Sequence, residues 1–312
     1  METHIPVMLQ EIVGIFEHAV PSRGNAFFVD ATLGGGGHSK AMLERFPNLR
    51  IVGLDRDETA LALAASRLSG YGTRFTAVHA NFGELSTRAA ALRKEHGGYA
   101  IGVLFDYGVS NMQLSTPERG FSFQEDGSLD MRMSPAADIP TAADIIRESG
   151  TGELAGIFRV FGEEKNAFRI AKGITCAKEA GETLDTTMKL VAAIRRSLPA
   201  AIQRHMGGNP ARKIFQALRI AVNSELEEIP KGLEGALELT GDGGFIVSLS
   251  YHSLEDRLVK RTFKNWEAEG RGFVRTKRPA VPSEEETNAN RKARSAKMRV
   301  FAVKKGNDIL KN

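Results

Sequence analysis

Residues 27–43 read FFVDATLGGGGHSKAML, and this stretch decides the fold. The apolar run at 27–29 is typical of a buried strand, and it ends at Asp30. Glycines at 34–37 then precede a helical pattern that begins near His38. A strand, a glycine-rich turn and a helix form the first unit of a nucleotide-binding α/β fold.

The spacing of the glycines indicates which ligand this turn suits. A dinucleotide fingerprint has glycine at its first, third and sixth positions, and Gly34 and Gly36 fit the first two, whereas Ser39 takes the sixth. The spacing instead resembles the S-adenosylmethionine (SAM) loop of class I methyltransferases, Asp-x-Gly-x-Gly-x-Gly, with Thr32 in place of the first glycine. On the loop alone, a tight turn without a ligand remains the alternative.

Composition narrows the class of protein. The chain has 312 residues, 42% hydrophobic and 26% charged, which is ordinary for one large or two modest globular domains. No apolar run approaches the ~20 residues of a membrane span, and the first residues lack the pattern of a signal peptide. The single cysteine, Cys176, excludes an internal disulfide and a cysteine-cluster zinc site, so we expect a cytoplasmic protein. No His, Asp and Glu grouping has metal-site spacing, and we expect no catalytic metal.

Charge is unevenly distributed along the chain. Residues 270–312 hold 12 Lys and Arg against 4 Asp and Glu, a net charge of +8, whereas the whole chain carries +4. A basic C-terminal segment on a mildly acidic body suggests a polyanion partner, and a solvated tail is the alternative.

Two further strand ends carry side chains suited to an adenosine. The strand at 51–54 ends at Asp55, about twenty residues beyond the glycines, where a carboxylate can accept both ribose hydroxyls. A helix cap is the alternative for Asp55, although Asp57 fits that role better. Phe82 follows the strand at 75–79 and either lies against the adenine ring or belongs to the core.

The α/β rhythm stops after the fourth strand. That strand, at 100–105, ends at Asp106, and ligands and chemistry lie at such carboxyl ends of parallel strands. We expect residues 111–208 to form an inserted loop and helical domain for substrate recognition, with the chain returning near residues 207–210. The discontinuous methyltransferase domain would then comprise residues 1–110 and 209–312, beginning with a helical lead-in at 1–26. Its remaining expected elements are helices at 212–228 and 233–239, a turn at 241–244, and strands at 245–250 and 299–303.

Longer strings resemble the MraW/RsmH family of 16S ribosomal RNA cytosine methyltransferases, which modify the exocyclic amino nitrogen N4. The strings are HIPVML at 4–9, DATLGGGGHS at 30–39, LDRD at 54–57, GFSFQEDGSLDMRM at 120–133, FQALRIAVNSELEEI at 215–229, SYHSLEDRLVK at 250–260 and ARSAKMRV at 293–300. The resemblance spans nearly the whole chain. It implies a Rossmann-like class I SAM-dependent methyltransferase sheet domain with an inserted α-helical domain, the fold class that the pattern of elements also indicates.

The resemblance also implies the residues that contact SAM. These are Gly36, Gly37, His38, Asp55, Phe82, Asp106 and Gln113. His38 and Gln113 rest mainly on the family. The chain departs from the usual family residues at Tyr107, Met112, Ser115, Ser134 and Asn209, which cluster near the substrate side and bear on the RNA target rather than the cofactor.

Methyl transfer to a cytosine amino group needs an aligned acceptor and a hydrogen-bond partner for the amino hydrogens. Asp106 or a nearby backbone carbonyl is placed for this, and Asp106 alternatively only anchors SAM. His252 and Ser253 follow a neighbouring strand and can orient the base or accept a proton, although a helix-start hydrogen bond is the alternative for His252. Carbon-5 methylation would need a cysteine nucleophile, and Cys176 lies mid-helix in the insertion, which favours amino-nitrogen chemistry.

The target base must be unpaired or leave its stack to reach such a site. We expect RNA contacts from aromatic side chains in the 111–140 loop and from basic side chains in that loop and the tail. They are Arg119, Phe121, Phe123, Arg132, Arg291, Lys292, Arg294 and Lys297. The partner would be 16S rRNA or the small ribosomal subunit, with the oligomeric state open. A non-catalytic SAM-binding ribosome assembly factor and, less favoured, an NAD-dependent Rossmann oxidoreductase are the competing functions.

Overall fold

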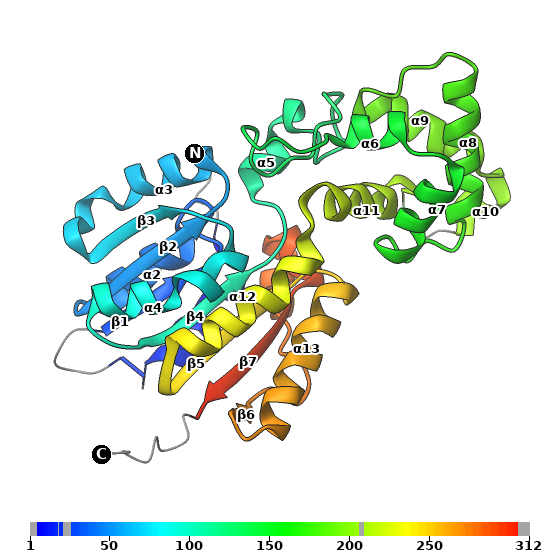
Figure 1. Cartoon of the computed structure of the whole chain (residues 1–312). Helices are drawn as coiled ribbons and strands as arrows, with labels where there is room; N and C mark the ends of the chain where they lie inside the picture. The colour runs from blue at the N-terminus through cyan, green and yellow to red at the C-terminus, as the bar shows by residue number, and fades with distance from the viewer. Residues whose placement is uncertain (1–4, 18, 21–25, 206–208, 305–312) are drawn as a thin grey trace. The chain divides into compact units, whose positions relative to one another are not determined.

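The chain forms two compact units, each with its own core. A computed structural model describes residues 5–17, 19–20, 26–205 and 209–304. The sheet unit comprises residues 1–108 and 226–312, and the helical unit comprises residues 109–225 (Figure 1).

The sheet unit is built on seven strands. They are β1 (Ala26–Asp30), β2 (Leu49–Asp55), β3 (Phe75–His79), β4 (Ala100–Asp106), β5 (Thr240–Ser250), β6 (Gly272–Val274) and β7 (Lys297–Val303). Their spatial order is β3-β2-β1-β4-β5-β7-β6. The first five in that order pair in parallel, and β7 pairs antiparallel with both β5 and β6. The order reverses between β1 and β4, which is where doubly wound sheets bind their ligands. The predicted Rossmann-like class I fold is confirmed.

Helices cover both faces of this sheet because its strands are apolar on both sides. In β1, Phe27 and Val29 share a core with α4 (Leu85–His96), α12 (Glu225–Leu239) and α13 (Ser253–Ala268), whereas Phe28 faces the core that holds α1 (Leu9–Phe16) and α2 (Gly37–Arg45). The remaining elements of the unit are α3 (Glu58–Leu68), α14 (Glu284–Ala289), and the 3-10 turns η1 (Ser69–Arg74), η2 (Phe82–Glu84) and η4 (Arg291–Ser295).

The helical unit holds a separate apolar core. Its elements are α5 (Asn111–Ser115), η3 (Pro117–Arg119), α6 (Ala142–Glu148), α7 (Thr151–Val160), α8 (Ala167–Glu179), α9 (Thr187–Ser197), α10 (Ala200–His205) and α11 (Ala211–Asn223). Ile146, Phe158, Ile174, Ile194 and Leu218 are buried together in this core. None of the helices in the described ranges has the length and apolar character needed to cross a bilayer.

The boundary of the helical unit differs from the prediction. The division falls after Gly108 and after Glu225, so α11 belongs to the helical unit, whereas we predicted a return to the sheet domain at residue 209. Buried residues on one face of α11, such as Ile214 and Leu218, complete the helical core. Residues 207 and 208 of the predicted return point lie outside the described residues.

Other elements also differ from the prediction. The lead-in helix expected over residues 1–26 is the shorter α1, and residues 1–4, 18 and 21–25 lie outside the described residues. The turn expected at 241–244 is part of β5, which has a register irregularity there. The three-residue β6 was missed because a strand that short carries no readable alternation.

Candidate active site

The glycine turn after β1 is open where a ligand would approach. Gly34 has a φ of +51°, and a Cβ atom added to it would meet no atom within 4 Å. Gly36, with a φ of +72°, is the residue that precedes α2. Positive φ angles are readily adopted by glycine, which explains both positions. Gly37 is different, because a Cβ there would lie 2.6 Å from Pro6 Cγ, so its lack of a side chain serves the packing of the N-terminal segment.

Ser39 explains why the sixth position of the turn is not glycine. Its hydroxyl donates to Asp30 Oδ2 at 2.7 Å, and both side chains are buried. Burial raises the pKa of Asp30 above its ordinary value, while His38 and the Ser39 hydroxyl oppose this rise. The hydrogen bond therefore anchors the first turn of α2 to the end of β1.

Asp55 holds the turn through backbone hydrogen bonds. Its Oδ2 accepts from Gly34 N at 2.7 Å, and its Oδ1 accepts from Asp57 N at 2.9 Å. Burial raises the pKa of Asp55 from 3.8 to about 6, although both backbone hydrogen bonds oppose this rise. Asp57 accepts from Thr59 N at 3.0 Å and caps α3, which confirms the cap role predicted for Asp57.

Asp106 lies where three segments meet at the end of β4. Its Oδ1 accepts a hydrogen bond from the Tyr251 hydroxyl at 2.6 Å. Its backbone N–H donates to Thr32 Oγ1 at 2.6 Å. The threonine that replaces glycine in the SAM-loop pattern thus ties the β1 turn to the β4 end. The Asp106 side chain remains 16% exposed, so its carboxylate is accessible at the edge of the sheet.

His38 approaches the same carboxylate from the glycine turn. Its Nδ1 lies 3.9 Å from Asp106 Oδ2, and its Nε2 lies 3.0 Å from Val7 O. Because a carbonyl oxygen only accepts, Nε2 carries a hydrogen and the imidazole orientation is fixed. Nδ1 therefore faces Asp106 either as a lone pair or, when the ring is protonated, as a second donor.

Tyr251 is a hydrogen-bond donor rather than an acid in this arrangement. Burial, followed by the neighbouring Asp106 carboxylate, raises the pKa of Tyr251 well above its ordinary value. The hydroxyl therefore keeps its proton and donates a hydrogen bond to Asp106, which fixes the rotamer of that carboxylate.

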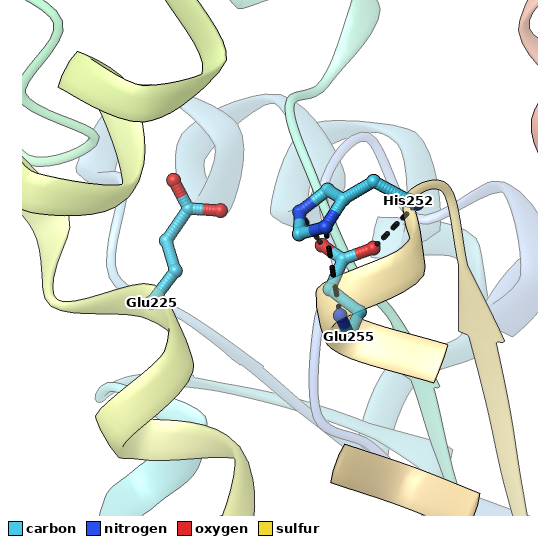
Figure 2. Close-up of side chains that lie close together, drawn as sticks. All are labelled: Glu225, His252 and Glu255. Carbon is cyan, nitrogen blue, oxygen red and sulfur yellow. Dashed lines mark hydrogen bonds and ion pairs between the residues drawn. The ribbon is translucent and has the colours of Figure 1, made fainter. Parts of the chain in front are cut away.

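His252 and Ser253 begin α13, and Figure 2 shows the His252 ring beside the Glu255 carboxylate. His252 Nδ1 accepts weakly from Glu255 N at 3.5 Å, and its Nε2 lies 3.1 Å from Glu255 Oε1. Glu255 is only 1% exposed, and its Oε2 accepts a hydrogen bond from Tyr251 N at 2.7 Å. The helix-start alternative for His252 is therefore realised. Figure 2 also draws Glu225, whose Oε1 accepts from Arg219 Nε at 2.8 Å.

Phe82 and Gln113 are both used in packing or capping. The Phe82 ring lies edge-on to that of Phe105, with 5.9 Å between the ring centres, and tilted to that of the buried Tyr107, with 5.5 Å between the ring centres. Phe82 therefore borders the sheet core. Gln113 belongs to the helical unit, where it closes a capping box with Ser110 and is 5% exposed.

The side chains expected to contact RNA in the 111–140 loop have partners within the loop and the helical core. Phe121 is 8% exposed in the helical core, and Phe123 packs edge-on against Phe215 at 4.9 Å. Arg132 forms a two-pronged ion pair with Asp130, and Arg119 Nη2 donates to the backbone oxygens of Arg132 and Met133 at 3.1 and 2.9 Å. These contacts hold the loop together, and the stacking and phosphate roles of its side chains stay predictions.

The basic tail residues have different surroundings. Lys292 Nζ lies 4.7 Å from the centre of the Tyr251 ring. Arg291 and Arg294 are exposed, and Lys297 is partly exposed. All four precede or begin β7, so they lie on the sheet unit.

Sequence reasoning missed the hydrogen-bonding roles of Tyr251 and Glu255. A signal was available for Glu255, because the spacing from His252 to Glu255 matches a capping box with histidine in the first place. For Tyr251 the signal was its position just beyond β5, the parallel neighbour of the strand that ends at Asp106.

Comparison with known proteins places this geometry in a family. The MraW methylase family matches residues 1–304. A protein of Beutenbergia cavernae named ribosomal RNA small subunit methyltransferase H is 49% identical over 258 residues, which cover 83% of this chain and 75% of that protein. A protein of the same name from Carboxydothermus hydrogenoformans is 44% identical and covers 95% of this chain and 96% of that protein. The chain belongs to the MraW methylase family.

Proposed function

We propose that the protein is a SAM-dependent methyltransferase that methylates N4 of a cytidine in small-subunit (16S) ribosomal RNA. Relatives named ribosomal RNA small subunit methyltransferase H, at 44–49% identity, support the RNA substrate. The observation that carries the chemistry is the accessible Asp106 carboxylate, held by the Tyr251 hydroxyl at the end of β4.

The residues of the sheet unit fit SAM. The open backbone at Gly34 leaves room for a ligand against the turn. The Asp55 carboxylate uses one lone pair of each oxygen for backbone N–H groups, which leaves acceptor capacity for two ribose hydroxyls. We assign cofactor contacts to Gly36, His38, Asp55, Phe82 and Asp106. When bound, SAM supplies an electrophilic methyl group on a sulfonium.

Asp106 is suited to activate an exocyclic amino group. The cytosine amino nitrogen is a poor nucleophile because its lone pair is delocalised into the ring. A carboxylate that accepts an amino hydrogen favours the pyramidal, nucleophilic form and can take up the proton that the nitrogen loses. Tyr251 donates to Oδ1, so Oδ2 is the oxygen that we assign to the amino hydrogen. His252 acts through its position at the start of α13, where it orients the residues that follow β5.

The chemistry of the chain disfavours carbon-5 methylation. That reaction requires a cysteine nucleophile that attacks the ring. The only cysteine of the sequence, Cys176, lies on α8 of the helical unit. We assign substrate recognition to the helical unit and phosphate contacts to the basic tail.

Mass spectrometry of product nucleosides tests the proposal. The protein is incubated with labelled SAM and unmethylated small-subunit rRNA, and the RNA is digested to nucleosides. We expect label in N4-methylcytidine. Label in 5-methylcytidine or in a ribose would overturn the atom that we assign, and tight SAM binding without transfer would favour an assembly factor. Calorimetric binding of NAD and not of SAM would favour the oxidoreductase alternative.

A further inference from the structure

A cavity of about 450 Å³ lies on the sheet unit. Its lining combines Tyr251, His252 and Ser253, which follow β5, with residues that precede or begin β7. The topology explains this meeting. Because β7 is antiparallel to β5 and Lys297 pairs with Ser250, the end of one strand adjoins the start of the other.

The lining of the cavity combines cationic and apolar side chains. Arg294 and Lys297 supply the charge, and no carboxylate is among the described residues that line it. Arg294 Nε donates to Thr287 O at 3.2 Å, which holds the guanidinium at the cavity. Lys297 Nζ lies 4.0 Å from Asp256, whose Oδ1 accepts from Arg299 at 2.6 Å, so Asp256 is already paired with another cation.

The apolar residues of the lining suit a base or a ribose. They are Val281, which is 63% exposed, Pro282 and Tyr251. The volume falls within the ~300–1,000 Å³ of small-molecule sites and suits a single nucleotide.

Tyr251 links this cavity to the reacting centre. Tyr251 lines the cavity, while its hydroxyl donates to Asp106 Oδ1 at 2.6 Å. Asp106 itself is not among the lining residues. This arrangement suits a nucleotide next to the acceptor rather than the acceptor itself.

We propose that this cavity binds the nucleotide of the RNA substrate that adjoins the methylated cytidine, with its phosphate on Arg294 and Lys297 and its base or ribose against Val281 and Pro282. The proposal rests on the proposed function in that the polyanion is RNA. It assigns two of the four basic tail candidates to one phosphate.

Binding of fluorescently labelled, unmethylated small-subunit rRNA, in the presence of S-adenosylhomocysteine, tests this assignment. The double variant Arg294→Gln/Lys297→Gln removes the two charges of the cavity. The matched control, Lys277→Gln/Arg278→Gln, removes two charges from exposed residues of the same basic segment that do not line the cavity. We expect the cavity variant to bind RNA about tenfold more weakly at moderate salt and the control to change by less than about twofold.

The salt dependence of binding provides a second readout. Loss of one or two phosphate contacts lowers the slope of log affinity against log salt by roughly 0.7 for each contact to a single strand. Val281→Glu, which keeps both cations and places a negative charge at an exposed cavity position, should also weaken RNA binding while SAM affinity is retained. Equal affinity and equal slope for the cavity and control variants would overturn the assignment.

The outcome is separable from that of the proposed function. RNA binding is measured without methyl transfer, so a cavity effect without N4-methylcytidine would reject the activity and keep the site. Normal formation of N4-methylcytidine, with cavity and control variants alike, would reject the site and keep the activity.

Discussion

The carboxyl edge of the sheet and the 111–140 loop of the helical unit both looked functional in sequence, and they differ in how they use their polar side chains. At the sheet edge, Asp106 and Asp55 retain acceptor capacity that the fold does not consume. In the loop, the charged groups of Arg119 and Arg132 are bonded to the loop itself. Position at the end of a parallel strand therefore predicts an available polar group better than residue type in a polar loop does.

The largest test of this contrast is Asp106→Ala. We expect methyl transfer to fall by about a thousandfold, because the variant removes the acceptor for the amino hydrogen, while the fold is retained. Asp106→Asn keeps an acceptor for Tyr251 but loses the charge, and should be intermediate. Initial rates with labelled SAM and circular dichroism measure the two effects. Wild-type turnover in Asp106→Ala would place the reacting centre elsewhere.

Phe121→Ala tests the loop side of the contrast. Phe121 is buried in the helical core, so we expect its truncation to lower the free energy of unfolding by about 3 kcal/mol. Phe168→Ala is the matched control, because Phe168 is 58% exposed in the same unit and should cost less than about 0.5 kcal/mol. Chemical denaturation measures both. An unchanged stability together with weaker RNA binding would restore the stacking role that we first expected.

Acidification should weaken SAM binding through Asp55. Its pKa of about 6 means that the folded protein takes up a proton as the pH falls below that value, and a protonated carboxyl accepts fewer hydrogen bonds. We expect SAM affinity to fall by up to about tenfold per pH unit below pH 6 and to level off above it. Calorimetry from pH 5 to 8 measures this dependence. Asp55→Asn should bind weakly at every pH, and an unchanged acid dependence in that variant would assign it to another group.

The smallest expected effect is that of Asp57→Ala. This variant removes the cap of α3 and should lower the free energy of unfolding by about 1 kcal/mol. The neighbouring Asp55 keeps its hydrogen bond to Gly34, so SAM affinity should change by less than about threefold. A SAM affinity as low as that of Asp55→Asn would show that the two aspartates share one role.

Most of the sheet unit could be predicted from sequence because buried parallel strands are apolar runs that end in polar residues. The strands that end at Asp30, Asp55 and Asp106 follow this pattern. The helix cap at Asp57 could also be predicted, because an aspartate directly precedes the helical pattern. The edge strand β6 could not be predicted, because its three residues depend on pairing with β7 rather than on their own composition.

Contacts between segments that are distant in the chain limit how much of the site can be predicted from sequence. The hydrogen bond from Tyr251 to Asp106 joins residues 145 positions apart, and local patterns do not contain such a pairing. The burial of Phe121 likewise depends on helices that follow it in the chain. The family resemblance supplied His38 and Gln113, and the structure supplies the partners that fix each of them.

The short segment before α1 has a practical consequence for handling the protein. Val7 O holds the His38 ring, and Met8 N donates to Glu286 Oε1 at 2.7 Å, so one stretch of backbone secures both the glycine turn and α14. Proteolytic removal of residues 5–8 would remove the partner of His38 beside the glycine turn. It would also remove the hydrogen bond to Glu286 that holds α14 beside the basic tail. A preparation clipped there should therefore lose cofactor affinity and RNA affinity together, and the integrity of the first eight residues is the property to verify by intact mass before either is measured.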